Sequence, residues 1–450
     1  MEYGKYKELW HKLLSAKRFN AQTKKRGFSL REPGPREGRT PFEADIGRVV
    51  FSQPFRRLAG KTQVHPFSSI DYVHNRLTHS NEVAYVSRAL GRRAATYILK
   101  NAGDLESDSQ VELIGWVCQA AGMMHDIGNP PYGHAGEDAI RAWGIKNEAA
   151  LTDVCGKDVC IDVCHFDGNA QAFRMACRPG LRESCYFKFT AATLGAMVKY
   201  PWLTSDKRSL QKNKSSAFST EKQLFDALKK ELGLNNGQRH PLSYLTEAAD
   251  DICYRINDFE DAVIMGLMEE GEVKDLLLDG MTYANQQLHR DAPLSRVRAI
   301  AVGELIDEFS NVFRREYVAI MKGRFVDDLR SHVSDRWGGV LARIKEKYDL
   351  IFSERKKVIT EIGAYGQLES LLDKYLYFLK EVKESRGKGG LPPYKELTFL
   401  SQRLVTLAWG GERYYESNRA QLMSWWAHAA LDFIVGMTDD YLHRISAEFM

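Results

Sequence analysis

The sequence predicts a mainly α-helical fold with at most a small β-hairpin. Most long segments repeat apolar residues at the three- and four-residue spacing of a helix. Strand-like patterns are limited to short pieces near 61–67 and 183–190, which are consistent with a hairpin. Polar stretches predict a mobile basic arm at 20–40, a solvated basic loop at 204–220 and a late boundary at 386–394. Helical periodicity and the scarcity of strand patterns together indicate the all-α class.

The predicted helices carry the polar residues of interest near their ends. Apolar residues recur after Asn81 on the face that also carries His79, so a helix begins close to this histidine. The apolar run VELIGWVCQAAGMM predicts a helix over 111–124, which ends where glycines and a Pro-Pro pair force a loop. Ser243 and Thr246 are candidate caps of a long later helix. Further helices are expected from near Gly133 through GEDAIRAWG and over 243–269, 296–351, 361–384 and 421–445.

Composition limits the class of protein. The chain has 450 residues, 44% of them hydrophobic and 27% charged, and no run of 18 apolar residues, so we expect a globular protein without a membrane span. The N-terminus lacks a signal-peptide pattern, and seven cysteines, an odd number, favour reduced thiols and a cytoplasmic location. The net charge of +4 allows a polyanionic partner without requiring one.

The stretch MMHDIGNPPYGHAGED concentrates histidines and carboxylates around a Gly/Pro loop. His125 and Asp126 end one predicted helix, and His79 starts another. Asp250 lies inside the long core-like helix, where Asp251 competes with it for the same role. Two imidazoles and two carboxylates from three helices suit a divalent metal with open positions for water and substrate oxygens. Each residue alone has an ordinary structural explanation, so it is the joint pattern that indicates a metal site.

This order, H…HD…D, resembles the HD-domain metal-dependent phosphohydrolases, and longer stretches are similar to the bacterial deoxyguanosinetriphosphate triphosphohydrolase (dGTPase) family. The stretch HDIGNPPYGHAGE is long and specific. The likeness runs from about residue 45 to the C-terminus and is densest over 55–262. The other similar stretches are FRRLAGKTQV (55–64), NRLTHSNEV (75–83), DGNAQAFR (167–174), MVKYPW (197–202), EAADDICYRINDFEDA (247–262) and GMTDDY (436–441).

The resemblance implies an HD-domain helical core with additional helices on both sides. We expect an N-terminal helix and basic arm at 1–44, the HD phosphohydrolase core at 45–290, and a C-terminal helical region at 291–450 that completes the substrate pocket and makes oligomer contacts. The implied assembly is a homo-oligomer, a hexamer being one candidate. Some members of the family bind single-stranded DNA, for which the basic loop at 204–220 is a candidate surface beside the simpler interpretation of a solvated loop.

The implied activity is the hydrolysis of dGTP, with other dNTPs left open, to a deoxynucleoside and tripolyphosphate. Such an enzyme would control dNTP pools. One alternative is a broad dNTP triphosphohydrolase that a second dNTP activates at an allosteric site. Another is a catalytically silent nucleotide or single-stranded DNA sensor, which the presence of every motif residue disfavours.

The resemblance also assigns the reacting groups. The metal ligands would be His79, His125, Asp126 and Asp250, holding Mn or Mg, with Fe, Co and Ni left open because such ligands accept all of them. His134 and Glu137 lie three residues apart at the start of a helix and would form the catalytic proton-handling pair. In it, His134 would activate water or protonate the departing 5′-oxygen.

The substrate contacts follow from the same likeness. Gln63 would contact the deoxyribose near its 3′-hydroxyl, where a ribose 2′-hydroxyl would be crowded. Tyr254 and Asp258 follow Asp250 at i+4 and i+8 on one helix face, so Tyr254 would pack on the sugar and Asp258 would accept a hydrogen bond from the 3′-hydroxyl. The expected triphosphate contacts are Lys199, Tyr200 and Arg57, with Arg56 and Lys61 as further candidates and a structural ion pair as the alternative for Arg57.

A cluster of thiols precedes the DGNAQ motif. Cys155, Cys160, Cys164 and His165 follow a C-x4-C-x3-CH spacing, which is not a standard zinc pattern. Buried thiols are therefore expected here in preference to a second metal.

Overall fold

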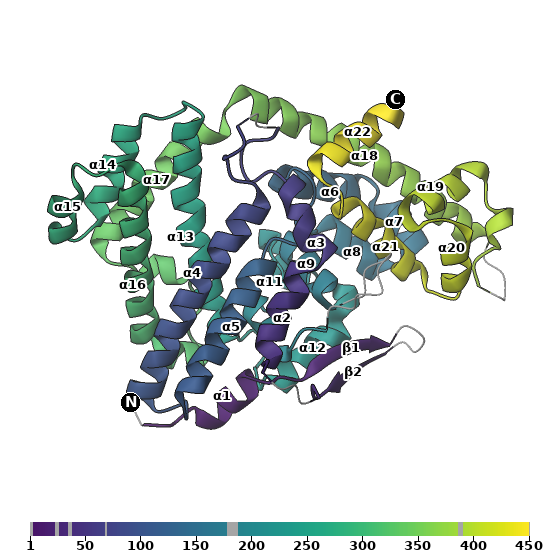
Figure 1. Cartoon of the computed structure of the whole chain (residues 1–450). Helices are drawn as coiled ribbons and strands as arrows, with labels where there is room; N and C mark the ends of the chain where they lie inside the picture. Colours follow the sequence, from purple (N-terminus) through teal and green to yellow (C-terminus); the bar gives the residue numbers. More distant parts are fainter. Residues whose placement is uncertain are drawn as a thin grey trace.

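The computed structural model confirms the mainly α-helical class (Figure 1). The structure describes residues 3–22, 27–34, 38–67, 70–177, 188–385 and 390–449. Within these ranges it has 22 α-helices and one two-stranded antiparallel sheet. No helix among the described residues is both long and apolar enough to cross a membrane.

Short 3₁₀- or π-helical turns, labelled η, lie between the α-helices and strands, and the elements fall into three consecutive groups along the chain. The first group comprises α1 (Lys7–Leu13), β1 (Arg18–Gln22), β2 (Gly27–Arg31), α2 (Pro41–Val50), α3 (Gln53–Arg57), η1 (Leu58–Gly60), α4 (Arg76–Tyr97), η2 (Ile98–Ala102), α5 (Asp108–Met124), α6 (His134–Lys146), α7 (Glu148–Cys155), α8 (Lys157–Cys164) and α9 (Gly168–Cys177). The second comprises α10 (Ala191–Met197), α11 (Lys207–Lys212), η3 (Ser219–Glu221), α12 (Lys222–Glu231), α13 (Pro241–Ile264), α14 (Glu270–Gly280), α15 (Tyr283–His289) and α16 (Leu294–Met321). The third comprises η4 (Leu329–His332), α17 (Asp335–Phe352), α18 (Arg355–Glu384), η5 (Tyr394–Glu396), α19 (Phe399–Trp409), α20 (Glu412–Asn418), α21 (Met423–Val435) and α22 (Asp439–Phe449).

The central core forms where α4 and α5 pack along each other and α13 packs against both. Asn75 begins α4 with a capping box, because its side chain accepts hydrogen bonds from the backbone N–H groups of Leu77 and Thr78 (both 3.0 Å). The helix α13 begins at Pro241 with His240 as its cap, so the prediction of Ser243 or Thr246 as caps was wrong. Proline at the first helical position has no N–H to lose, which explains the earlier start.

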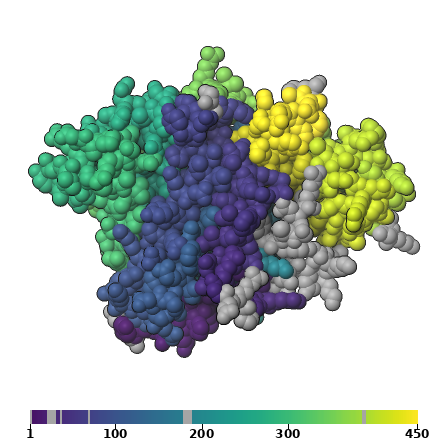
Figure 2. All heavy atoms as spheres, in the orientation of Figure 1, coloured from purple at the N-terminus to yellow at the C-terminus, as the bar shows by residue number. Residues whose placement is uncertain are grey.

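Two further groups of helices flank this core, one on each side (Figure 1). The helices α14–α17 pack together and against α13 at one side, whereas α19–α22 lie at the other. The 30-residue helix α18 runs between the two sides and contacts α6, α7, α21 and α22. The space-filling view in Figure 2 shows the same division, with the N-terminal helices exposed between the two flanking groups.

Two predicted long helices are in fact broken. The segment 296–351 is divided into α16 and α17, because the Asp328 side chain accepts a hydrogen bond from the Ser331 N–H (2.8 Å) and starts the short turn η4. The segment 421–445 is divided into α21 and α22, where the Thr438 hydroxyl accepts a hydrogen bond from the Tyr441 N–H (3.2 Å). Side chains that bond to nearby backbone N–H groups therefore interrupt an otherwise helical apolar pattern.

The β-hairpin lies in a different segment from the predicted one. Residues 61–67 contain no strand, and of the other piece 183–187 lie outside the described residues. The strands β1 and β2 instead fall largely within the expected mobile arm, with Arg18 opposite Arg31. Arg18 explains the order, because its buried guanidinium donates hydrogen bonds to Asp45 Oδ1 and to the Pro41 carbonyl (both 2.6 Å). Arg18, which directly precedes the expected arm, is thus part of a buried ion pair.

Candidate active site

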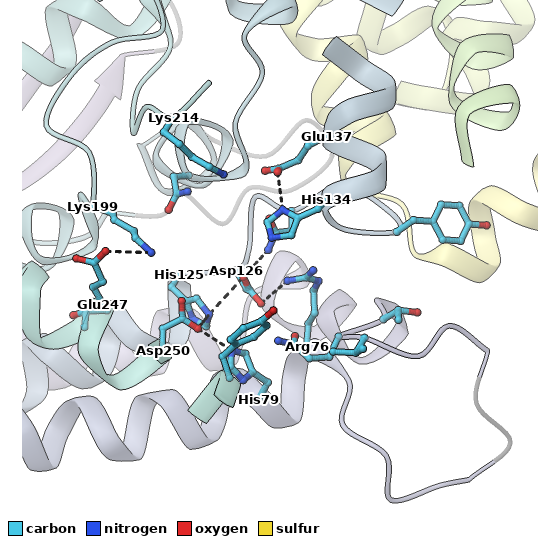
Figure 3. A pocket seen from close by; sticks show the side chains of 18 of the residues that line it. Arg76, His79, His125, Asp126, His134, Glu137, Lys199, Lys214, Glu247 and Asp250 are labelled. Carbon is cyan, nitrogen blue, oxygen red and sulfur yellow. Dashed lines mark hydrogen bonds and ion pairs between the residues drawn. The ribbon is translucent and has the colours of Figure 1, made fainter. Parts of the chain in front are cut away.

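A cavity of about 300 Å³ lies where the start of α4, the end of α5, the start of α6 and the middle of α13 meet. Every residue predicted for the site lines it except Asp258, Arg57 and the two further phosphate candidates Arg56 and Lys61. Figure 3 shows the polar side chains of these elements converging on one space. His79, His125 and Asp126 lie together in it, whereas His134 lies beside Glu137. Segments almost 200 residues apart in the sequence thus build one site.

Four of these side chains form a compact cluster of candidate metal ligands. Atoms of His79, His125 and Asp126 lie within 4.8 Å of one another. Asp250 Oδ1 completes the group at 3.2 Å from His79 Nε2 and 3.5 Å from His125 Nε2. His125 Nε2 also lies 3.5 Å from Asp126 Oδ1. Two imidazoles and two carboxylates at this spacing can surround a single divalent ion.

The orientation of His125 fits this use. Its Nδ1 donates a hydrogen bond to the Gly122 carbonyl (2.7 Å), so the lone pair is on Nε2. Nε2 is buried and has no hydrogen-bond partner. A buried polar atom without a partner is costly, and a metal ion would remove that cost. The donor set therefore fits a divalent cation on its own geometry.

Asp126 is held in place by two neighbours that the sequence did not single out. Arg76 Nη1 donates to Asp126 Oδ2 (2.7 Å), and Asn129 Nδ2 donates to Asp126 Oδ1 (2.5 Å). Burial alone would raise the pKa of this carboxyl, but the nearby Arg76 and the two histidines of the cluster lower it to about 2. Asp126 is therefore a carboxylate that is ready to coordinate a cation.

Asp250 and its neighbour Asp251 have different surroundings. Asp250 faces the histidines, and although burial raises its pKa, His125, His79 and Lys199 lower it further than burial raises it. Asp251 points to the other side of α13, where it pairs with Arg330 (3.1 Å) and Arg255 (3.3 Å). Burial raises the pKa of Asp251 to about 6. The helical spacing argument for Asp250 therefore agrees with the geometry.

His134 and Glu137 face each other at the start of α6, as their i, i+3 spacing indicates. His134 Nδ1 donates a hydrogen bond to Glu137 Oε2 (2.9 Å), and Glu137 Oε1 accepts one from the Gly168 N–H (2.7 Å). The Glu137 side chain is only 3% exposed, whereas that of His134 is 83% exposed at the mouth of the cavity. Burial raises the pKa of Glu137, but His134, Lys214 and the Gly168 N–H lower it to about 2. The pair is thus an oriented imidazole on a buried carboxylate.

The loop between α5 and α6 fixes the distance between the cluster and this pair. Gly133 has φ of +56°, and a Cβ there would lie 2.4 Å from Arg76 Nη2. At Gly168 a Cβ would lie 2.4 Å from Asn129 Oδ1 and 2.8 Å from Glu137 Oε1. Only glycine allows the close approach at these two positions. Both glycines therefore serve the geometry of the site.

The predicted sugar contacts have different depths. Gln63 and Tyr254 line the cavity, and Gln63 Oε1 is buried without a hydrogen-bond partner. Asp258 lies one turn beyond Tyr254, is 1% exposed and does not line the cavity. Burial, followed by the charge of Asp261, raises the pKa of Asp258 well above its ordinary value. Tyr254 itself packs against Tyr348, with ring centroids 5.3 Å apart.

Two lysines and a tyrosine form a second polar part of the cavity lining. Lys199 Nζ lies 3.4 Å from Glu247 Oε1. Burial alone would lower the pKa of Lys199, but Glu247 and other neighbouring groups raise it by more. Tyr200 lines the cavity beside it. Lys214 lines the cavity from the segment predicted as a solvated loop. That prediction was wrong for its second half, because Ala217 and the residues next to it are buried.

The other predicted phosphate contacts lie elsewhere. Arg57 is exposed and outside the lining of the cavity, and its Nη2 donates to Gln53 Oε1 (3.0 Å). Arg56 is also exposed and does not line the cavity. Lys61 is buried and donates to the carbonyls of Asn129 (2.5 Å) and Val435 (2.7 Å), so it binds the protein's own backbone.

The structure adds residues that the sequence patterns did not indicate. Arg76 and Glu247 each precede a predicted ligand by three residues on the same helix, a spacing that was available as a signal. Lys214 had no such signal. The far end of the cavity is lined from α17 and α18 by Phe352, Lys357, Thr360 and Glu361.

The thiols before the DGNAQ motif lie away from the cavity. Cys155, Cys160 and Cys164 are free and buried, with Cys160 Sγ and Cys164 Sγ 3.8 Å apart. His165 Nδ1 instead lies 2.7 Å from Asn213 Oδ1. Burial raises the pKa of Cys155 and of Cys164 to about 12, which disfavours thiolate ligands. Among the described residues, His79, His125 and Asp126 are the one group of His, Cys, Asp and Glu side chains that lie close enough together to hold a metal ion.

Comparison with known proteins shows the family of the chain. The chain is 36% identical over 438 residues to a protein of Pseudomonas aeruginosa named deoxyguanosinetriphosphate triphosphohydrolase-like protein, covering 91% of this chain and 93% of that one. A protein of the same name from Synechocystis is 33% identical, with 96% of both chains covered. A deoxyguanosinetriphosphate triphosphohydrolase of Yersinia enterocolitica is 28% identical, covering 89% of this chain and 92% of that one. No family model matches the chain. On the first two likenesses, the chain belongs to the deoxyguanosinetriphosphate triphosphohydrolase family.

Proposed function

We propose that this protein hydrolyses dGTP to deoxyguanosine and tripolyphosphate with the help of a divalent metal ion. The observation that carries the proposal is the meeting, in one cavity, of a His/Asp cluster, an imidazole on a buried carboxylate and a wall of cations. A metal ion in the cluster would polarise the phosphate, the imidazole would transfer the proton, and the cations would bind the triphosphate. Water would attack the α-phosphorus, and the bond from phosphorus to O5′ would break.

His79, His125, Asp126 and Asp250 would hold the ion, with Mn²⁺ and Mg²⁺ as the first candidates. Such an ion polarises a phosphoryl oxygen and lowers the pKa of bound water. Arg76 and Asn129 would keep the Asp126 carboxylate oriented toward it.

His134 would handle the proton of the reaction. Glu137 accepts the Nδ1–H of His134, so the lone pair of His134 Nε2 is available to take a proton from water. Once Nε2 is protonated, it can donate that proton to the departing O5′. The buried carboxylate would stabilise the imidazolium formed between these two steps. Glu137 is kept rigid by the Gly168 N–H, which limits the imidazole to one orientation.

Cations would bind the triphosphate. Lys199 and Lys214 line the same side of the cavity (Figure 3). Tyr200, whose ring centroid lies 5.8 Å from Lys199 Nζ, adds a hydroxyl to the lining. Four negative charges on the nucleotide need several such partners. When tripolyphosphate leaves, the same lysines would stabilise its additional charge.

The sugar and the base would lie toward α17 and α18. Tyr254, Tyr348 and Phe352 form a row of aromatic rings, with Tyr348 and Phe352 stacked at 5.1 Å. Such rings offer a surface for a sugar and a base. Beyond them Lys357 and Glu361 form an ion pair at the end of the cavity. A carboxylate suits the N–H donors of guanine and an ammonium suits its O6 and N7 acceptors, which favours guanine over adenine.

The test is a panel of the four dNTPs with Mn²⁺ or Mg²⁺, with products identified by mass spectrometry. We expect deoxyguanosine and tripolyphosphate from dGTP at the highest rate. Release of dGMP and pyrophosphate, or activity only when a second dNTP is present, would contradict the proposal. Asp250→Asn should abolish turnover, whereas Asp251→Asn is the matched control, because Asp251 points away from the cluster. Mn²⁺ should raise the melting temperature of the Asp251 variant but not of the Asp250 variant.

A further inference from the structure

The segment Val435–Asp439, between α21 and α22, contacts both sides of the candidate active site. It lies next to α3 and η1, since a Cβ on Gly60 would be only 2.7 Å from Thr438 Cγ2. This segment belongs to the last part of the chain, and none of its residues lines the cavity. Figure 1 shows α21 and α22 on the side of the molecule where α3 and α6 lie.

The carboxylate of Asp439 joins two backbone segments that are 70 residues apart. Its Oδ2 accepts a hydrogen bond from the Thr62 N–H (2.8 Å), and its Oδ1 accepts one from the Tyr132 N–H (2.9 Å). Asp439 is 3% exposed, so both bonds are shielded from water. In addition, the Tyr132 hydroxyl donates to the Asp439 carbonyl (3.3 Å) and to Gln367 Oε1 (3.0 Å).

Lys61 strengthens the same junction from the other direction. Its Nζ donates to the carbonyls of Asn129 and Val435, and the side chain is 2% exposed. Burial lowers the pKa of Lys61 to about 7, although the charge of Asp439 opposes this change. The charged pair thus spans three segments, those of residues 61–62, 129–132 and 435–439.

Two of these three segments carry residues of the site. Thr62 directly precedes Gln63, which lines the cavity, and Tyr132 comes two residues before His134. Asn129, held by Lys61 through its carbonyl, orients Asp126 through its side chain. The distance between the Gln63 segment and the His134 segment is therefore set by a group outside the cavity.

We propose that Asp439 is a positioning residue that holds the Gln63 segment and the His134 segment at their working separation. The inference rests on the proposed function for its effect on turnover, but its geometric part stands without it. A carboxylate can accept from both N–H groups at once, whereas an amide has a single acceptor oxygen and would leave one buried N–H without a partner. Asp439 bonds to none of the candidate metal ligands, which come from α4, the residues directly after α5, and α13, so replacement of Asp439 should change metal affinity little.

The test compares Asp439→Asn with Asp440→Asn. Asp440 is the matched control, because it follows directly in the chain, is 62% exposed and forms an ion pair with Arg444 (3.0 Å) on the surface. Hydrogen–deuterium exchange should become faster in peptides that contain Thr62 and Tyr132 in the Asp439 variant alone. For dGTP, kcat/KM should fall by about 10²-fold, as misplacement of reacting groups by roughly 1 Å implies, with Mn²⁺ affinity within twofold of wild type.

A second variant tests the same junction without altering its charges. Gly60→Ala places a Cβ against Thr438 and should move the segment Val435–Asp439, giving the same local exchange pattern and a smaller loss of kcat/KM. Equal exchange in the Asp439 and Asp440 variants would overturn the proposal. So would faster exchange throughout the core, or a loss of Mn²⁺ affinity, since either indicates a general structural role. If the wild type hydrolyses no dNTP, the proposed function fails, and the exchange result still decides whether Asp439 holds the two segments.

Discussion

Glu137→Gln is the substitution with the most direct consequence for the chemistry. Glutamine has the shape of glutamate, and its oxygen can still accept the Gly168 N–H. Its amide, however, would donate toward His134 Nδ1, which moves the ring proton to Nε2, the nitrogen that the reaction needs free. The fold should be unaffected, while the oriented base is lost.

The size of the effect can be worked from the environment of Glu137. Its pKa is lowered from an ordinary 4.5 to about 2 by His134, Lys214 and the Gly168 N–H, against the effect of burial. This preference for the charged form corresponds to roughly 3 kcal/mol as an upper figure. Because His134 is 83% exposed, water weakens the pair, and about 1–3 kcal/mol is the expected loss. That loss is a fall in kcat of roughly 5- to 150-fold.

The assay is single-turnover hydrolysis of dGTP at saturating Mn²⁺, followed by the release of deoxyguanosine. Asp138→Asn is the control, because this exposed neighbour of Glu137 forms its ion pair with Arg141 and does not line the cavity. The melting temperature of each variant checks that the fold is intact. A rate for Glu137→Gln within threefold of wild type would refute the reasoning, as would an equal loss in the Asp138 variant.

Three further predictions concern binding and stability. Lys214→Gln should raise KM for dGTP by about tenfold with a smaller change in kcat, and an unchanged KM would exclude Lys214 from triphosphate binding. Glu361→Gln should lower the dGTP-to-dATP ratio of kcat/KM by about 10-fold or more, and an unaltered ratio would move base recognition away from the Lys357–Glu361 pair. His74→Gln should destabilise the fold by roughly 1–3 kcal/mol at pH 6. Burial lowers the pKa of His74, but bonds to Asp261 and Glu82 raise it to about 9, so the stabilisation is complete below about pH 6.5 and is lost toward pH 9. Urea titrations at pH 6 and pH 10 that gave the same difference would contradict this ionic account.

Local patterns predicted the parts of the site that are local in the chain. His134 and Glu137 face each other because three residues make about one helical turn, and Asp250 is separated from Asp251 by the same periodicity. The helix over 111–124 ends within the motif because the glycine and proline residues after it cannot continue the helix. The candidate metal ligands were thus predicted by short-range rules together with one long-range likeness.

Contacts between distant segments could not be predicted in the same way. Lys214 was interpreted as part of a solvated loop, because a lysine in a polar run is usually exposed and nothing in the run indicates the buried residues that follow. Arg57 was assigned to the triphosphate, yet α3 directs it to the outside of the molecule. The hairpin was misplaced because Arg18 is neutralised by Asp45, which lies 27 residues away.

Several expectations stay predictions. These are the homo-oligomer, the contact with single-stranded DNA, the native metal and the division of the chain at residues 44 and 290. The proposed boundary at residue 290 must be judged by what the C-terminal part contributes to the site. Phe352 and Glu361 line the cavity, and Asp439 holds two segments at its edge. A region with these contacts is part of the site's framework, so we expect that a chain cut at residue 290 would retain the metal ligands and lose nucleotide binding.

The chemical groups of this site and its geometry come from different parts of the sequence. The reacting groups lie in short motifs, in which a histidine and a carboxylate are neighbours or one turn apart. Their separation is set by buried charges that touch no substrate, such as Lys61 and Asp439, whose partners are backbone groups up to 377 residues away. A buried charge that binds only backbone atoms of two site segments has few acceptable replacements, because any other side chain leaves a donor or an acceptor unpaired. Substitution of Asp439 should therefore reduce turnover about as much as substitution of a residue that contacts the substrate, while metal binding is retained, because the Asp439 carboxylate bonds to no residue of the metal cluster.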